Sequence, residues 1–431
     1  MTNRASWILA CAAVLALSGC GGGEEDKGAD PKIRLLNLSA GYTSLDMMTN
    51  LDSDEDDEDE TQVTGVQLET VSEYTTLDPD DYTVKVRRTG SGSVLRSFAG
   101  EELTEDVINT YVAYGEVGNF GALRVDDTLD DADAGENKLS VANVSSAGLL
   151  DIYLTDANTD LDDTTPVLSS IGGTLTMVVA DSGTYRLRVT ASGDTSDVRL
   201  DVPSFALSDK GVEAMILTST KGGMLANAIV LPQGGQPTKY TNTKARLRGA
   251  VGLANGANAS IQVNGQSVLT AATAGVIGSR YVLLDAGSVP VTLTVNGMAV
   301  PVANVNLTAG ADYTLLVWSS ANGTQTSLIN DDNRLPSSGT KLRLLNGMSS
   351  LASPITLSVD FSPVIEGTLT GQVSDEIEIT SGTDRQFDVS NTSTAQSVLT
   401  RSAITLQGAS VYTFFMTDNG ATPIGVLRRD R

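Results

Sequence analysis

The chain has 431 residues, with 28 Lys+Arg against 53 Asp+Glu and no histidine, so its formal net charge is −25. This acidic balance disfavours a nucleic-acid partner, because such binding depends on Lys and Arg that neutralise phosphates. The lack of histidine excludes His general bases, zinc sites that use His, and switching by His near neutral pH. The length alone predicts roughly three domains.

The first feature in chain order is an N-terminal segment, residues 1–19, that reads as a lipoprotein signal peptide. Arg4 supplies the positive charge, and the apolar run at 7–17 is shorter than the roughly 20 residues that span a bilayer. The sequence LSGC, ending at Cys20, resembles the bacterial lipobox, so we expect cleavage before Cys20 and attachment of lipid to it. The alternatives are an ordinary signal peptide with an incidental cysteine, or a cytosolic apolar N-terminus. Cys11 would leave with the signal, and one remaining cysteine cannot form a disulfide within the chain.

Residues 20–31 follow as an anchor and flexible tether, with no apolar side chain larger than Ala between Gly21 and Pro31. Gly rather than Asp after the cysteine resembles lipoproteins sorted to the outer membrane of Gram-negative bacteria. We therefore expect the lipid to hold the protein at a membrane of the cell envelope, with the folded part in the aqueous phase.

Four repeats of one unit make up the rest of the chain. Similar segments open at Lys32, Lys138, Lys244 and Lys341, beginning KIRLLN, KLSVAN, KARLRG and KLRLLN. Such self-similarity indicates repeated structural units. The turn-rich stretches between the repeats predict sandwiches over residues 32–135, 136–240, 241–339 and 340–431.

Alternation of apolar and polar residues dominates each unit, and helical periodicity is nearly absent. In the third unit, Asn264-Gly265 and Asn296-Gly297 lie between alternating runs and are typical of two-residue hairpin turns. Seven or eight short strands in about 100 residues predict an immunoglobulin-like β-sandwich. We therefore expect an all-β chain of four tandem sandwiches. The short linkers favour a rod of touching domains.

Aromatic residues in the last two units are expected to be structural. Tyr313 and Tyr412 each enter a late strand after a Gly turn, which is typical of a tyrosine corner, although a plain inward-facing aromatic would fit equally well. Trp318 and the pair Phe414-Phe415 lie in strands that should be largely buried, so we expect core positions rather than a sugar-binding platform.

The repeats resemble a known family. The openings, the LDIYL strand at 150–154, the SGTY run at 182–190 and the LTAG run at 307–314 are similar to the bacterial domain of unknown function numbered 4397, most clearly in the second and third units and least in the first. The resemblance implies an exported lipoprotein or cell-surface protein with tandem copies and no agreed activity. The family's first strand ends in a turn resembling His-Ala-Ser-Pro, which residues 37–39 and 143–145 replace without His or Pro. It supplies no catalytic residue.

Acidic loops are the candidate metal sites. The loop after the second strand of unit two contains Asp156, Asn158, Asp160 and Asp162, whose oxygens could bind Ca²⁺. Leu161 stands where an EF-hand needs Gly, and Val167 stands where it needs a bidentate Glu. The run from 52 to 60 and the stretch 126–133 are similarly acidic. The alternative is that these loops are only solvated charge.

These observations favour a non-enzymatic binding or adhesion module. Ser–His and Cys–His catalysis need a histidine that the chain lacks, and the acidic loops contain no isolated carboxylate pair of the kind a glycosidase uses. The partner could be a glycan, matrix or an envelope protein. The alternatives are a structural spacer without a ligand and a Ca²⁺-responsive acidic module.

The acidity is confined to the half nearer the anchor. Residues 20–240 hold 15 Lys+Arg and 40 Asp+Glu, whereas residues 241–431 hold 12 and 13. We infer that the proximal half acts as a charged standoff and that the nearly neutral distal half presents the contact surface.

Overall fold

A computed structural model describes residues 28–52, 58–336, 338–420 and 422–431. The regular elements in this part of the chain are β-strands, which confirms the all-β prediction. The described ranges contain no helix with the length and apolarity that crossing a bilayer requires.

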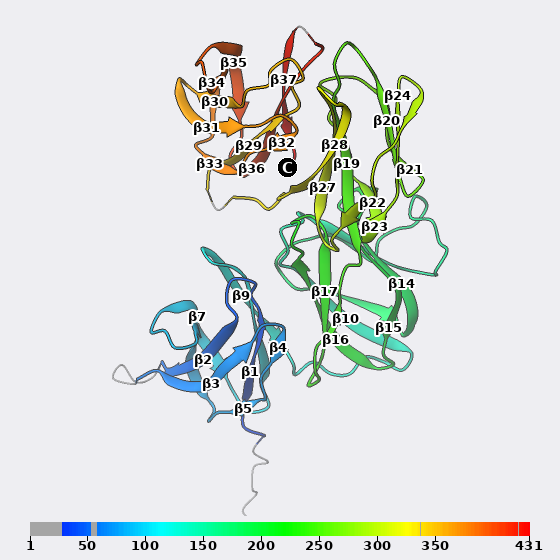
Figure 1. Cartoon of the computed structure of the whole chain (residues 1–431). Helices are drawn as coiled ribbons and strands as arrows, with labels where there is room; N and C mark the ends of the chain where they lie inside the picture. Colours follow the sequence, from blue (N-terminus) through cyan, green and yellow to red (C-terminus); the bar gives the residue numbers. More distant parts are fainter. Residues whose placement is uncertain (1–27, 53–57, 337, 421) are drawn as a thin grey trace, which may run out of the picture.

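The strands form four successive groups, which we number sandwich 1 to sandwich 4 (Figure 1). Sandwich 1 contains β1 (Lys32–Leu38), β2 (Ser44–Leu51), β3 (Glu60–Gln67), β4 (Thr70–Val71), β5 (Thr75–Thr76), β6 (Asp80–Arg88), β7 (Val94–Leu103), β8 (Ile108–Glu116) and β9 (Asn119–Asp126). Sandwich 2 contains β10 (Glu136–Asn143), β11 (Leu150–Thr155), β12 (Leu168–Ile171), β13 (Thr176–Asp181), β14 (Gly183–Ala191), β15 (Asp194–Leu207), β16 (Gly211–Ser219), β17 (Ala226–Pro232) and β18 (Thr238–Tyr240).

Sandwiches 3 and 4 repeat this plan. Sandwich 3 contains β19 (Lys244–Gly252), β20 (Ala259–Val263), β21 (Gln266–Ala272), β22 (Val282–Asp285), β23 (Gly287–Val289), β24 (Val291–Val295), β25 (Met298–Val300), β26 (Val305–Leu307), β27 (Asp312–Ser320) and β28 (Gly323–Asp331). Sandwich 4 contains β29 (Thr340–Asn346), β30 (Ile355–Val359), β31 (Ser362–Thr368), β32 (Gln372–Val373), β33 (Ile377–Ile379), β34 (Gly382–Asn391), β35 (Ser397–Leu406), β36 (Ser410–Asp418) and β37 (Pro423–Arg429).

Each sandwich has an opening sheet, defined as the sheet that contains its first strand, and a second sheet; in sandwich 3, β23 and β26 also form a two-stranded sheet. In sandwich 1 the opening sheet has the order β4-β1-β8-β9, with β5 also paired to β1, and the second sheet has the order β3-β2-β6-β7. β1 pairs with β8 in parallel, and the equivalent parallel pairs are β10 with β16, β19 with β27 and β29 with β36.

The strand order differs from that of a constant immunoglobulin domain. There the first two strands, A and B, share one sheet, whereas here β1 and β2 lie in different sheets, as do the first two strands of the other sandwiches. The prediction of tandem β-sandwiches is therefore confirmed, with this difference in strand order from a constant immunoglobulin domain. Alternation of apolar residues predicts strands but does not determine which sheet each strand joins.

The opening strands are buried on both faces. In β1, Ile33 and Leu35 contribute to the core between the two sheets, whereas Leu36 and Leu38 belong to a separate apolar cluster on the opposite face. A strand buried on both sides has a nearly continuous apolar sequence instead of strict alternation. This explains the LLNL and RLLN runs in the repeat openings.

The outer faces of the opening sheets pack against one another in pairs. Sandwiches 1 and 2 share an apolar cluster of Leu36, Leu38, Val112, Val125, Ala142, Ala214, Ile216, Ile229 and Leu231. Sandwiches 3 and 4 share a smaller cluster of Ala250, Leu316, Ile329, Leu345 and Phe415. A Cβ on Gly252 would lie 2.5 Å from the carbonyl oxygen of Gly347, so this close approach of two backbones requires glycine.

The four sandwiches do not form the expected rod. Figure 1 shows sandwiches 1 and 2 side by side, with 3 and 4 side by side beyond them. Arg334, in the segment between sandwiches 3 and 4, donates to Glu116 of sandwich 1 over 2.9 Å. Short linkers permitted a rod, but the apolar outer faces of the opening sheets favour side-by-side pairs.

The pairing of sandwiches 3 and 4 can be tested at Phe415, which is fully buried in their shared cluster. Phe415→Ala should lower the free energy of unfolding by about 3–5 kcal/mol, and calorimetry should show the two sandwiches unfolding in separate transitions. Phe361→Ala, at a side chain that is 79% exposed, is the control and should change stability by less than about 0.5 kcal/mol. Equal effects of the two substitutions would contradict the pairing.

Candidate functional site

A triad of Arg, Thr and Asp occupies the same place in three of the four opening sheets. The Arg lies on the first strand, the Thr lies beside it on the parallel neighbour, and the Asp directly follows or ends the last strand of the ladder. The triads are Arg34, Thr110 and Asp127; Arg248, Thr314 and Asp331; and Arg343, Thr413 and Asp430. Each lies on the outer face, where the sandwiches pair.

Sandwiches 3 and 4 exchange ion pairs through their triads. Arg248 of sandwich 3 donates to Asp430 of sandwich 4 over 2.5 Å, and Arg343 of sandwich 4 donates to Asp331 of sandwich 3 over 2.6 Å. These four side chains are at most 4% exposed. In a site excluded from water, each charge needs its partner, so the exchange fixes how the two sandwiches dock.

Tyr281 completes the cluster from the segment before β22. Its hydroxyl donates to Asp331 over 2.7 Å, and the guanidinium carbons of Arg246 and Arg248 lie 4.6 and 4.9 Å from its ring centre. Burial, followed by the negative charge of Asp331, raises the pKa of Tyr281 well above its ordinary value. The phenol therefore stays protonated and serves as a donor.

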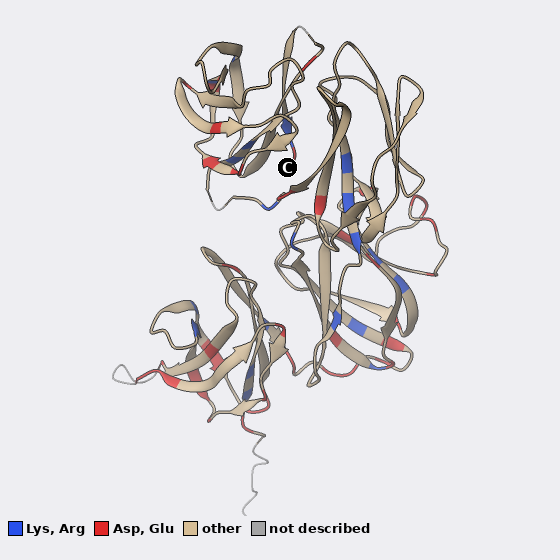
Figure 2. Ribbon diagram, in the orientation of Figure 1, with Lys and Arg blue, Asp and Glu red and all other residues tan. Residues whose placement is uncertain are grey.

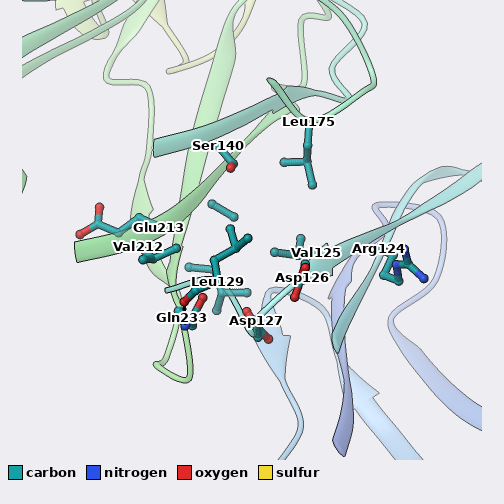
Figure 3. A pocket seen from close by; sticks show the side chains of 12 residues that line it. Arg124, Val125, Asp126, Asp127, Leu129, Ser140, Leu175, Val212, Glu213 and Gln233 are labelled. Carbon is teal, nitrogen blue, oxygen red and sulfur yellow. Dashed lines mark hydrogen bonds between the residues drawn. The ribbon is translucent and has the colours of Figure 1, made fainter. Parts of the chain in front are cut away.

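Sandwich 2 lacks the triad. Ser140, Ala214 and Gln233 occupy the equivalent register positions, so Arg34 of sandwich 1 instead donates to the backbone carbonyl of Gly235 over 2.7 Å. A cavity of about 220 Å³ lies at this place between sandwiches 1 and 2. Figure 3 shows Ser140, Leu175 and Gln233 of sandwich 2 around it, with Val125 and Asp127 of sandwich 1. The short side chains of Ser140 and Ala214 leave this space open.

A second cavity, which we call the arginine pocket, lies where sandwiches 2, 3 and 4 meet. Its volume is about 310 Å³. It is lined by Asp194, Ser196, Asp197, Arg199, Met224, Arg246, Arg248, Ser279, Arg280, Tyr281, Arg428 and Asp430. Figure 2 shows basic residues gathered along β19, whereas acidic residues are spread over sandwich 1.

Contacts between sandwiches hold the rim of the arginine pocket. Arg280 of sandwich 3 donates to the Ser196 hydroxyl of sandwich 2 over 3.2 Å, and Arg428 of sandwich 4 donates to the Ser279 carbonyl of sandwich 3 over 3.0 Å. Within sandwich 2, Arg199 donates to Asp197 over 2.6 Å. The pocket therefore depends on the relative placement of three sandwiches.

Positive charge is crowded in and beside this pocket. Burial, and then the nearby Arg246, lower the pKa of Arg199. Burial together with Arg199 and Arg246 lowers the pKa of Arg431 to about 10. An added anion would relieve this repulsion.

The predicted calcium residues do not come together as a metal site. Asp160 accepts from the backbone N–H of Asp162 over 3.1 Å, and Asp162 accepts from the Thr195 hydroxyl over 2.7 Å. Arg186 and Arg188 of β14 donate to backbone carbonyls of this loop, at Ala157 and Thr159 respectively. Among the described residues, no group of three or more acidic or cysteine side chains is placed to hold a metal ion.

The other predicted residues have different outcomes. Cys20 and residues 53–57 of the acidic run lie outside the described residues. The tyrosine-corner interpretation is confirmed: Tyr313 accepts from the backbone N–H of Thr308 over 3.1 Å, and Tyr412 accepts from that of Gln407 over 3.2 Å.

The aromatic residues that were expected to be structural lie in apolar clusters, as predicted. Phe414 lies in the core of sandwich 4 and Phe415 in the cluster between sandwiches 3 and 4, while Trp318 packs half-buried against that cluster.

Sequence reasoning missed the triads and the arginine pocket. The signal was present in the repeat openings, where Arg34, Arg248 and Arg343 interrupt apolar strands.

Comparison with known proteins agrees with the family resemblance. Residues 31–153 match the model of a domain of unknown function, DUF4397, which covers sandwich 1 and the first two strands of sandwich 2. The match falls mainly on sandwich 1, the repeat in which the sequence motifs that resemble this family are least clear. No curated protein matches the chain.

Among solved structures, the chain is similar to the family 26 carbohydrate-binding module of Amy13K from Eubacterium rectale, in complex with maltoheptaose. The two share 10% identity over 46% of this chain and 96% of that one, with a TM-score of 0.16. A score this low does not establish a common fold.

The exchanged ion pairs predict an acid-dependent stability. Burial raises the pKa of Asp331, but Arg343 and Arg248 outweigh it and hold this pKa below its ordinary value. The pKa of the Asp331 carboxyl is therefore lower in the folded chain than in the unfolded chain, where it is about 3.9. Its ionised form stabilises the fold fully above about pH 3.9, and this stabilisation is lost as the pH falls through the pKa of the folded chain. Asp331→Asn should cost about 3–5 kcal/mol at pH 7, and the difference from the unmodified chain should shrink below about pH 4.

Urea unfolding between pH 7 and pH 3 measures this difference. Glu69→Gln is the control, because Glu69 forms an exposed pair with Lys239 that should contribute no more than about 1 kcal/mol. A cost for Asp331→Asn that stays constant with pH would contradict the assignment of the ion pair.

Proposed function

We propose that this chain is a non-enzymatic protein of the cell envelope, held by lipid on Cys20, that binds a partner through its distal sandwiches. The arginine pocket carries the proposal. It is built by residues of three sandwiches, and buried guanidinium N–H groups at its wall have no hydrogen-bond partner within the described residues. Buried donors of this kind are normally paired, so they point to a ligand.

The composition of the pocket supports binding rather than catalysis. The chain has no histidine to activate a serine nucleophile. The lining carboxylate of Asp430 is already engaged by Arg248 and Thr413, and that of Asp197 by Arg199. These carboxylates act as partners of arginine and are not free for acid–base chemistry.

The N-terminal sequence and the charge distribution support the proposed anchoring. The features around Cys20 favour lipid attachment, and the tether leads directly into sandwich 1. The proximal half holds 40 of the 53 acidic residues, and seven of the twelve residues that line the arginine pocket belong to sandwiches 3 and 4. Repulsion from anionic headgroups would hold the proximal pair off the bilayer and keep the pocket accessible.

The anchor is tested by Cys20→Ser. This substitution removes the thiol that would carry the lipid, so metabolic labelling with a fatty acid should be lost and the protein should move from the membrane to the soluble fraction. Cys11→Ser is the matched control and should leave both unchanged. Continued labelling and membrane association of the Cys20→Ser chain would overturn lipid attachment at this residue.

A binding assay separates the proposed module from a spacer. The chain from Gly28 onward, which contains every described strand, should be retained on at least one of three supports that carry envelope polysaccharide, extracellular matrix or envelope protein. Retention should persist when the acidic residues 58–60 are neutralised, because these lie away from the pocket. The spacer interpretation would hold if no support retains the chain and deletion alters only envelope integrity.

A further inference from the structure

We propose that the arginine pocket binds an oxyanion, a phosphate or carboxylate group of the ligand. This inference rests on the proposed function in taking the pocket as the binding site. It adds the chemical class that the site recognises.

Three guanidinium donors at the pocket have no partner within the described ranges. Nη2 of Arg248, Nε of Arg199 and Nε of Arg428 are buried and have no hydrogen-bond partner among the described residues. The side chain of Arg248 is 1% exposed and that of Arg199 is 5% exposed. A buried charged donor without an acceptor is costly, and an acceptor entering the pocket would remove that cost.

The side chains that line the pocket carry more positive than negative charge. Five arginines line the pocket against three aspartates, a surplus of two positive charges in a chain whose net charge is −25. The aspartates are already occupied: Asp194, for example, accepts from both the backbone N–H and the hydroxyl of Ser196. Arg246 is paired with Asp312 outside the lining, whereas Arg280 and Arg428 form no ion pair within the described residues, so the positive charge left to face the cavity is mainly theirs.

The geometry of the donor groups also suits an oxyanion. Guanidinium groups present N–H donors in a planar fork that matches carboxylate and phosphate oxygens. Arg248 is held by Thr314 over 2.9 Å and by Asp430 over 2.5 Å, and Arg246 is held by two bonds to Asp312. The Nε–Nη2 fork of Arg246 is used on Asp312, whereas Nη2 of Arg248 has no partner among the described residues. Both side chains are fixed before the ligand arrives, so little side-chain entropy is lost on binding.

Size agrees with this assignment. A volume of about 310 Å³ exceeds that of a single phosphate group and is at the lower end of small-molecule sites. It leaves room for a few atoms attached to the oxyanion, such as part of a sugar. A phosphorylated sugar and a uronic acid share the required chemistry.

The test measures binding of inorganic phosphate and of glucuronate by isothermal titration calorimetry, at constant ionic strength set with chloride. The protein is the chain from Gly28 onward. At least one of the two anions should bind and should raise the melting temperature. Phosphate binding with weaker glucuronate binding would identify a phosphate site, and the reverse would identify a carboxylate site.

The variants locate the site. Arg280 is exposed at the rim, so Arg280→Ala should fold normally and weaken binding about tenfold, the effect of one charge-assisted hydrogen bond. Adding Arg428→Ala should reduce binding below detection. Arg401→Ala, at an exposed arginine of β35 outside the pocket, should leave binding unchanged. Circular dichroism confirms that each variant is folded.

Two outcomes overturn the inference: neither anion binds, or Arg280→Ala and Arg401→Ala weaken binding equally. If an envelope support still retains the chain under either outcome, the proposed function stands without the oxyanion site. If an anion binds in the pocket but no support retains the chain, the site stands and the proposed partner binding fails.

Discussion

The burial of each opening strand on both faces is the constraint on which the rest of the structure depends. One face completes the core of the sandwich, and the other must be covered by a neighbour, because a sheet cannot leave a large apolar surface in water. The sandwiches therefore associate in pairs through their opening sheets. Arg34, Arg248 and Arg343 lie on this second face, and pairing of the sandwiches removes them from water. Each buried guanidinium group then needs a hydrogen-bond acceptor from the protein.

The sequence predicted the kind of structure well and its assembly poorly. Period-2 alternation and the repeat openings were enough for four β-sandwiches, and a Gly turn before Tyr313 and Tyr412 was enough for two tyrosine corners. Alternation of apolar and polar residues indicates only that one face of a strand is buried. The apolar run after Arg34 carried the missing information, since a strand with apolar residues on both sides needs two partners.

The residues of the arginine pocket were harder to predict, because they come from distant parts of the chain. Arg199, Arg246 and Arg428 meet only because three sandwiches are docked in one arrangement. The acidic loop at 156–162 was conspicuous in the sequence, but composition does not say what a loop faces. In the structure this loop lies against Arg186 and Arg188, whose N–H groups donate hydrogen bonds to its backbone carbonyl oxygens.

The absence of the triad from sandwich 2 has a consequence for how the chain assembles. Four similar units in one chain can associate with the wrong neighbour while they fold, a common failure of tandem repeats. Gln233 offers no carboxylate, so sandwich 2 cannot satisfy Arg248 or Arg343, whereas sandwich 1 finds in it the Gly235 carbonyl that Arg34 uses. A mispaired arrangement would bury an unmatched charge and be disfavoured. The presence of the triad in three sandwiches and its absence from sandwich 2 therefore determine which of these similar units pair with each other.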